Sequence, residues 1–478
     1  MTVVEKKETS GAARLAGQPT RALAEFVVGV KRNGVPDGVR AVLADAVLDA
    51  IGCGFFGLTT KPCRIAHDFA LDQGGPAEAS VWCSGGAGKV SLLNTVLANG
   101  TAIHGFDFDD HSRAKIHPGA AVLPTALALA ERENIDGETF LAAVAAGYEV
   151  MNRISLGANP NASRTKGWHL TGTTGTFGAA AAASVILGLD AEATAGAFGL
   201  AGTQSSGLWA FTADGAMTKR IHPGFAGRNG LTSALLVQRG FFGGSHILEA
   251  EDGSFLRATS DDPRPEEVVR GLGIEWRAEA VCFKPYPCCG SNHASIGASL
   301  DLMAENGFAA DDVDKVVIGV SRVVLLQTGY PYEKSTVLNA QMNIRYNVAV
   351  ALLDRGALIE QFTAERMEDP RLEALIKRID VVVDPEMDAI YPGRYGGIVT
   401  IHLKNGKTVT KRVDFSKGMP ENRMSPEEMS AKFVSLVAST TDKETAESLL
   451  VDLKGIFEMP NVGKIAARLG APSLRNSG

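Results

Sequence analysis

The feature that most limits the possible folds is a series of Ala- and Gly-rich segments in the first half of the chain. Their apolar residues recur at helical spacing; between residues 36 and 51, for example, Val39, Val42, Ala46 and Ala50 share one face. Small side chains allow neighbouring helices to pack closely. The pattern predicts an all-α bundle with helices over residues 20–30, 36–51, 92–102, 120–132, 137–154, 174–187 and 191–201.

The residue pattern changes near residue 273, where runs of β-branched residues replace the Ala-rich segments. We expect a helix over residues 292–306 and strands over 315–324, 379–383, 397–403 and 408–413. Helical patterns return at 425–438, 442–456 and 462–469. The chain is therefore predicted to be mainly α. A large all-helical domain (18–272 and 416–478) has a smaller α+β lid domain (273–415) inserted before its C-terminal helices, which are expected to pack back on the first domain.

Composition narrows the possible partners and location. The formal charge is −7 and there is no basic stripe with interleaved aromatic residues, so we expect no nucleic acid partner. No apolar run approaches the ~20 residues that a membrane-spanning helix needs. The six cysteines are too few for a disulfide framework in 478 residues and indicate reduced thiols. The polar N-terminal tail does not resemble a signal peptide, and we expect a cytoplasmic protein.

The densest polar segment, residues 104–119, holds three aspartates and three histidines. If residues 107–111 are helical, Asp107 and His111 share a face, and Asp107 could orient His111 as a general base. His117, before a proline, could point into a cleft. Two alternatives are a solvated helix end and a metal site, although the spacing matches no known metal motif. We predict no metal.

Two further segments suit the binding of an anion. In residues 166–178, His169 precedes small and hydroxyl residues at a predicted helix N-terminus, where free N–H groups would donate hydrogen bonds to a carboxylate. In residues 217–224, Lys219, Arg220 and His222 place three cationic or titratable side chains in four positions. The alternatives are a capped buried helix with a core histidine and a basic surface turn.

The fourth segment, residues 283–293, is stiffened by two prolines and contains Lys284, Cys289 and His293. A thiol near a lysine can exchange protons near neutral pH. A buried cysteine pair at a domain junction is the alternative interpretation. Six of the nine histidines fall in these four segments, which favours one shared functional site.

Motifs for common cofactors are missing. Residues 85–90 resemble a P-loop, but the spacing is wrong and Val90 stands where Ser or Thr is required. No GxGxxG follows a predicted strand and no GxSxG is present. We therefore expect no nucleotide or flavin cofactor and no serine-hydrolase chemistry.

Taken together, these motifs resemble the MmgE/PrpD family, which includes 2-methylcitrate dehydratase, cis-aconitate decarboxylase and iminodisuccinate epimerase. The resemblance covers about residues 22–469. The residues that carry it are Asn99-Gly100, His104-x-x-Asp107-Phe-Asp109-Asp110, His117-Pro118, Gly167-Trp-His169, Lys219-x-x-His222, Lys284-x-Tyr286-Pro287, residues 340–346 with Val348-Ala349, and residues 417–425.

The resemblance implies a helical domain, an α+β lid, a homodimer, and an active site between the domains without metal or organic cofactor. It implies that this site is lined by Asp107, His117, His169, Lys219, Lys284 and Tyr346. Two positions depart from the decarboxylase pattern: His111 stands where a threonine is found, and Cys289 where a histidine is found.

The activities of the family share one step, the movement of a proton on carbon beside a carboxylate of a small di- or tricarboxylate. Cationic side chains would have to stabilise the enolate; Lys219, Lys284 and His169 are candidates, with His222 beside them. His117 and Tyr346 are candidates for proton transfer.

The leading hypothesis is a hydro-lyase that resembles 2-methylcitrate dehydratase. Alternatives are an epimerase, in which Cys289 supplies a second proton-transfer group, a cis-aconitate-type decarboxylase, and a non-catalytic binding protein on the same fold.

Overall fold

The computed structural model describes residues 17–86, 88–213, 215–391 and 393–474, and the predicted polar tail falls almost entirely outside them. The chain divides into two compact units, Met1–Val281 with Ser425–Gly478 (unit 1) and Cys282–Met424 (unit 2). Both divisions lie C-terminal to the boundaries expected near residues 273 and 415. Ala278 N–H donates to Glu149 within unit 1, and Phe283 N–H donates to Gly418 O within unit 2, so backbone hydrogen bonds decide where each segment belongs.

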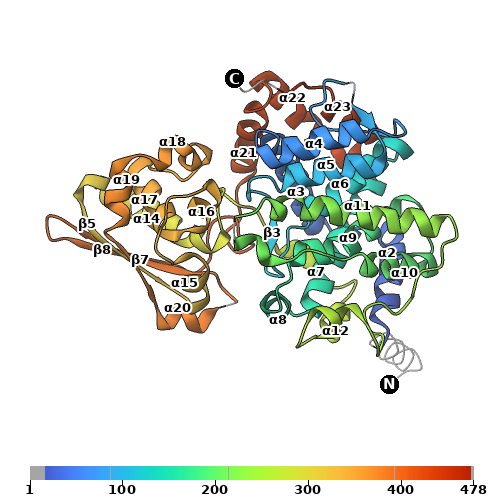
Figure 1. The fold of residues 1–478 in the computed structure, drawn as a ribbon, viewed down its shortest axis with the longest axis horizontal. Coiled ribbons are helices and arrows are strands. Elements are labelled where there is room, and N and C mark those ends of the chain that lie inside the picture. Colours follow the sequence, from blue (N-terminus) through green and yellow to red (C-terminus); the bar gives the residue numbers. More distant parts are fainter. Residues whose placement is uncertain (1–16, 87, 214, 392, 475–478) are drawn as a thin grey trace. The chain divides into compact units, whose positions relative to one another are not determined.

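Unit 1 is helical, as the periodicity predicts (Figure 1). Its helices are α2 (Pro19–Asn33), α3 (Asp37–Gly57), α4 (Lys61–Gln73), α5 (Leu92–Ile103), α6 (Gly119–Glu133), α7 (Gly137–Gly157), α8 (Pro160–Thr165), α9 (Leu170–Ile186), α10 (Ala191–Thr203), α11 (Thr218–Gln238), α12 (Phe255–Thr259), α13 (Pro265–Val269), α21 (Pro426–Ala438), α22 (Lys443–Lys454) and α23 (Gly463–Leu469). Helix α9 begins about one turn before its predicted start, and α11 was not predicted.

Helix α9 lies at the centre of unit 1, where it contacts α6, α7 and α11. Its residues from Leu170 to Ser184 are all buried, which explains why they are small or apolar on every face. On α11, a Cβ atom added to Gly230 would lie 2.3 Å from Thr176 O of α9. This close approach of two backbones requires glycine at position 230.

A Gly230→Ala substitution is therefore expected to lower the free energy of unfolding by about 1–3 kcal/mol, because the added methyl group forces α9 and α11 apart. Urea unfolding followed by circular dichroism measures the loss. Gly196→Ala in α10 is the matched control, since its new Cβ would meet its nearest neighbour at an ordinary 3.5 Å. Equal stability of the two variants would contradict the packing argument.

The C-terminal helices pack back on the first half of the chain, as predicted. Helix α21 contacts α3, and α23 contacts α6. Lys432 of α21 and Asp49 of α3 form a buried ion pair of 2.6 Å. The last helices are thus part of the core of unit 1.

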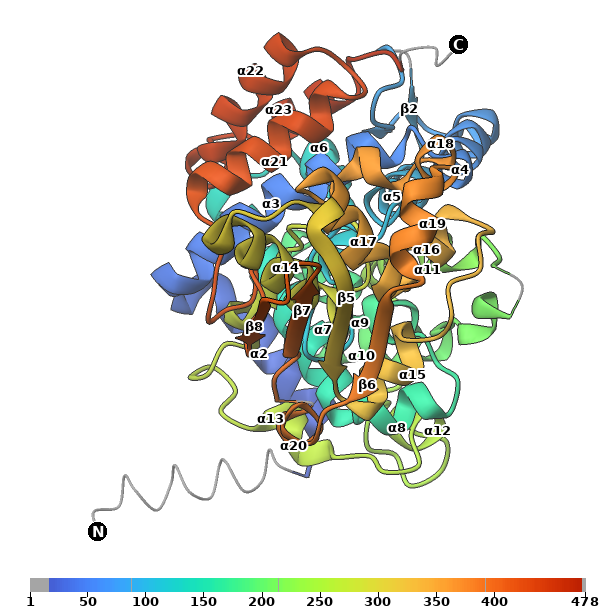
Figure 2. The same ribbon diagram turned by 90° about the vertical axis from the view of Figure 1, so that its left-hand side faces the viewer.

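Unit 2 contains a four-stranded sheet in the order β6-β5-β7-β8, seen face on in Figure 2. The strands are β5 (Val313–Val320), β6 (Ile379–Val383), β7 (Gly397–Leu403) and β8 (Thr408–Val413); β5 pairs parallel with β6, and the other pairs are antiparallel. Helices α14 (His293–Asn306) and α17 (Ile344–Asp354) contact each other and the sheet. The remaining helices are α15 (Arg322–Thr328), α16 (Val337–Met342), α18 (Ala364–Met367), α19 (Pro370–Ile376) and α20 (Pro385–Ile390).

The prediction that one strand reaches residue 324 is wrong. The strand β5 ends at Val320, and the Ser321 side chain accepts a hydrogen bond from Val324 N–H as the N-cap of α15. A capping serine satisfies a free helix N–H group, which favours a helix over continued extension.

Within the described residues, no single helix has the length and hydropathy to cross a membrane. The bent pair α3 and α4 meets those criteria only when the two helices are taken together. The residues of α3 from Ala46 to Gly57 are buried, as is usual for a core helix.

Candidate active site

The polar segment of residues 104–118 is the loop between α5 and α6, and residues 107–110 are not helical. Asp107 has a left-handed backbone conformation with φ of 59°, which a helix excludes. The basis for pairing Asp107 with His111 at helical spacing is therefore wrong.

Asp109 is the centre of this loop. Its carboxylate, which is fully buried, lies 2.9 Å from His104 Nδ1 and 3.2 Å from His117 Nδ1. Burial favours the neutral acid, but the two imidazoles together outweigh it and hold the pKa of Asp109 well below its usual value. Burial lowers the pKa of His104 to about 3, against the opposing effect of Asp109. A neutral His104 therefore donates its Nδ1–H to an ionised Asp109 at pH 7.

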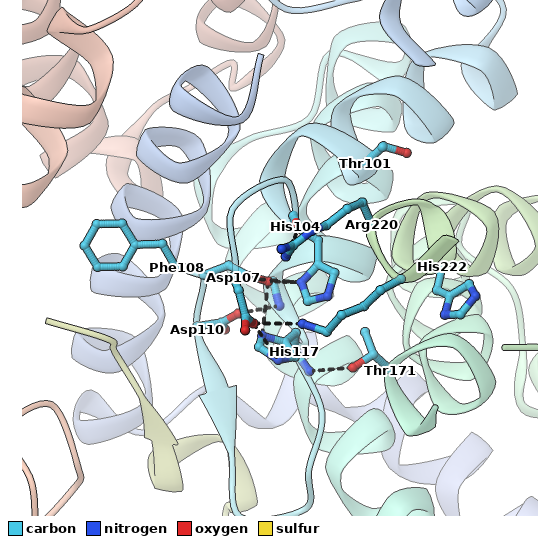
Figure 3. Close-up of polar contacts among 12 residues, drawn as sticks. Thr101, His104, Asp107, Phe108, Asp110, His117, Thr171, Arg220 and His222 are labelled. Carbon is cyan, nitrogen blue, oxygen red and sulfur yellow. Dashed lines mark hydrogen bonds and ion pairs between the residues drawn. The ribbon is translucent and has the colours of Figure 1, made fainter. Parts of the chain in front are cut away.

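Asp107 connects this loop to α11. Lys219 Nζ lies 2.9 Å from Asp107 Oδ1, and His117 Nε2 lies 3.9 Å from the same oxygen. Figure 3 shows Asp107, His104 and His117 turned toward one another. The backbone N–H of His117 also donates to Thr171 Oγ1 in the first turn of α9, at 3.1 Å. The arrangement places an ammonium group, a carboxylate and an imidazole within reach of one small ligand.

His169 and His222 form a second imidazole pair, with their Nδ1 atoms 2.9 Å apart. Burial, with contributions from His104 and Lys219, lowers the pKa of His169 well below its usual value. Burial and Lys219 lower the pKa of His222 to about 4. Both rings are therefore neutral at pH 7, and one donates its Nδ1–H to the other.

Ring contacts join five histidines of unit 1 (His104, His111, His117, His169 and His222) into a continuous group. The ring centroids of His104 lie 4.5 Å from His117 and 6.0 Å from His169, and those of His111 and His117 lie 6.4 Å apart. The structure thus brings together six residues that the sequence singled out: Asp107, His111, His117, His169, Lys219 and His222. It adds His104 and Asp109, whose candidacy the density of histidines and acids in the segment signalled.

The three other predicted residues belong to unit 2. Lys284 is buried and Cys289 is half-buried, with its backbone N–H donated to Gln341 O. Tyr346 is fully buried in α17; its hydroxyl donates to Gln361 O, and burial raises its pKa. Their roles stay predictions.

His104, Asp109 and His117 are also the described residues whose side chains could together hold a metal ion, since their ligand atoms lie within 4.8 Å of one another. An imidazole–carboxylate–imidazole set suits a transition metal. The same three groups are in direct hydrogen-bonding or ion-pair contact, which serves acid–base chemistry equally well.

The neutral buried histidines predict acid sensitivity. In the unfolded chain, histidines take up protons as the pH falls below their ordinary pKa of 6.5. In the folded protein the pKa is lowered to about 4 for His222 and about 3 for His104, so these two rings stay neutral until the pH is much lower. The free energy of unfolding should therefore fall as the pH drops below 6.5, a trend to be measured as urea midpoints from neutral to mildly acidic pH. The His222→Gln variant lacks one of these titrating rings, so its free energy of unfolding should fall less than that of the wild type. The His246→Gln variant replaces an exposed histidine and should show the same fall as the wild type. Equal falls in all three proteins would contradict this reasoning.

Curated relatives match along nearly the whole chain. The cis-aconitate decarboxylase-like protein oryM of Aspergillus oryzae is 29% identical over 476 residues, covering 94% of this chain and 97% of the relative. Cis-aconitate decarboxylase of Homo sapiens is 28% identical over 465 residues, with 95% of each chain covered. Cis-aconitate decarboxylase of Aspergillus terreus is 26% identical over 474 residues, with 95% and 96% covered. Decarboxylases of this kind are lyases, so these similarities support an enzyme of the lyase class.

Two family models match successive parts of the chain. The MmgE/PrpD N-terminal domain matches residues 21–268, and the MmgE/PrpD C-terminal domain matches residues 286–453. These matches cover both units and include the loop that carries Asp107, Asp109 and His117. The chain therefore belongs to the MmgE/PrpD family.

Proposed function

We propose that the protein is a lyase that acts on a small di- or tricarboxylate by moving a proton on the carbon next to a carboxylate. The observation that carries the proposal is the contact of Lys219 with Asp107 beside His117, which is itself held by Asp109. Proton loss beside a carboxylate leaves negative charge on oxygen, and a fixed ammonium group in a buried site stabilises that charge.

In the proposed mechanism, Lys219 binds the substrate carboxylate and stabilises the enolate that forms from it. His117 donates a proton to the substrate, and Asp109 fixes the orientation of its ring by contact with Nδ1. The neutral His169–His222 pair supplies a second group, which can accept a proton. Two such groups are what an elimination requires, one for each proton moved.

Dehydration of a citrate-like hydroxy acid is the first candidate reaction. The neutral His169–His222 pair takes the proton from carbon, the C–O bond breaks, and the hydroxyl leaves as water with a proton from His117. The product is an unsaturated acid. The presence of two separate acid–base groups in unit 1 favours this reaction.

Decarboxylation of cis-aconitate is the second candidate, favoured by the names of the three relatives. Here the bond between a carbon and its carboxylate breaks, CO2 leaves, and the electron pair stays on carbon. A proton from the enzyme then completes the product. The same Lys219 and His117 would serve this reaction, with His117 as the donor.

Incubation with a panel of citrate-like hydroxy acids and cis-aconitate in D2O, followed by proton NMR, tests the proposal. Loss of water with new olefinic signals would support dehydration, and release of CO2 with deuterium on the product carbon would support decarboxylation. Deuterium exchange or inversion of configuration without loss of either fragment would contradict a lyase and favour an epimerase. No change in any acid would contradict the proposal as a whole.

We propose further that the reaction needs no metal. Lys219 already provides the positive charge beside Asp107, and Asp109 is engaged by two imidazoles. Exhaustive chelation is expected to leave the rate unchanged. A bound metal in stoichiometric amount, together with loss of activity on its removal, would contradict this part of the proposal.

A further inference from the structure

Lys432, in the C-terminal helix α21, reaches the backbone of the loop that carries Asp107, Asp109 and His117. Only 6% of its side chain is exposed. Its Nζ atom donates to Asp49 Oδ1 at 2.6 Å and to Phe108 O at 2.9 Å, and it lies 3.9 Å from the centroid of the Phe108 ring. The ammonium group is therefore engaged by a carboxylate, a peptide carbonyl and an aromatic face.

Asp49 supplies the buried carboxylate of this ion pair. Burial raises the pKa of the Asp49 carboxyl, whereas the charge of Lys432 and its hydrogen bond lower it. The pair Asp49–Lys432 thus contacts the loop at the carbonyl of Phe108. That carbonyl belongs to the peptide bond that joins Phe108 to Asp109, the residue that contacts His104 and His117.

The side chains on either side of Asp109 complete this anchoring. Figure 3 shows Phe108 turned away from His104 and His117. The Asp110 carboxylate accepts hydrogen bonds from Gly119 N–H at 3.0 Å and from the Tyr148 hydroxyl at 2.8 Å. The residue before Phe108, Asp107, has a left-handed backbone that L-residues seldom adopt. Such a conformation persists where the surroundings determine it strongly.

We propose that Asp49 and Lys432 are positioning residues of the active site, which hold the peptide bond between Phe108 and Asp109 so that the Asp109 carboxylate fixes the His117 ring. This inference rests on the proposed catalytic role of His117. A buried ion pair can often be replaced by apolar residues of similar size with little loss of stability. Its presence at this place is therefore attributed to the geometry of the loop.

The test compares the Asp49→Leu/Lys432→Met double variant with the wild-type enzyme. Because the double variant leaves no single buried charge behind, we expect it to fold, with a Tm close to that of the wild type. A displacement of about 1 Å at catalytic groups can cost on the order of 100-fold in rate. We therefore expect kcat to fall about 10- to 100-fold, with a smaller change in KM, because Lys219 extends from α11, whereas Lys432 contacts the loop at Phe108.

Two controls separate positioning from general stability. Lys432→Arg keeps a donor and a positive charge, and is expected to recover part of kcat. Glu149→Gln breaks a different buried ion pair of unit 1, that with Arg153, and should lower Tm without lowering kcat. A double variant with wild-type kcat, or a Glu149→Gln enzyme with the same loss of kcat, would overturn the inference.

NMR of isotope-labelled histidine rings gives a measurement that needs no turnover. The ring N–H signals of His104 and His117 should shift in the double variant and stay in place in Glu149→Gln. Unchanged signals would overturn the positioning role whatever the activity. Shifted signals in a protein that turns over none of the acids would instead count against the proposed function alone.

Discussion

Replacement of Lys219 by Met is expected to lower kcat/KM for the acid substrate about 100- to 1,000-fold, the range seen when one donor to a developing oxyanion is removed. Lys219 is 7% exposed, and its ammonium group lies 2.9 Å from Asp107 in the same region as His117. Loss of this charge leaves the enolate and Asp107 without their cation. Initial rates over a range of substrate concentrations measure the effect.

Matched variants make this prediction specific to the site. Lys443→Met removes an exposed lysine of α22 and should keep wild-type kinetics. Asp107→Asn leaves the Lys219 ammonium group in place but weakens its orientation, so kcat should fall while Tm changes little. Wild-type kcat/KM in both Lys219→Met and Asp107→Asn would rule out this pair as part of the active site.

The largest effect on stability is expected at Arg153 of α7, a fully buried side chain. Its Nε atom lies 2.6 Å from Glu149 Oε1, and its terminal nitrogens donate to Val268 O at 3.2 Å, Arg270 O at 2.7 Å and Glu275 O at 2.6 Å. One guanidinium group therefore satisfies a buried carboxylate and three backbone carbonyls at the end of α13 and beyond it.

Arg153→Met should lower the free energy of unfolding by about 3–5 kcal/mol, the range for removing one partner of a buried ion pair. The methionine fills much of the volume, so the loss arises from the uncompensated Glu149 charge and the unpaired carbonyls. Urea unfolding measures the change. Arg239→Met, which replaces an exposed arginine, is the control. A loss of less than about 1 kcal/mol in Arg153→Met would lie within the range of a surface ion pair and would contradict the cost expected for breaking a buried one.

The helices of unit 1 could be predicted because their apolar spacing and their hydrogen bonds are both local. Helix α11 escaped prediction because its segment contains Pro223, Gly224, Gly227 and Gly230, residues that disfavour helices in isolation. The close contact with α9 overrides that propensity, and it joins segments about 50 residues apart in sequence. The strand predicted to reach residue 324 failed for a local reason, the capping role of Ser321.

Residue types alone located most of the candidate site, since histidines, aspartates and lysines gather in a few segments and the family motifs run through them. Their partners were decided by the tertiary structure. Lys219 meets Asp107 across 112 residues of sequence, and Lys432 meets Phe108 across 324. The left-handed backbone at Asp107 excludes the helix that would have paired Asp107 with His111, and Asp109 instead contacts His104 and His117. Composition and periodicity thus determine helices and the supply of reactive groups, whereas contacts between distant segments determine which of those groups meet, because such contacts depend on packing that no local pattern encodes.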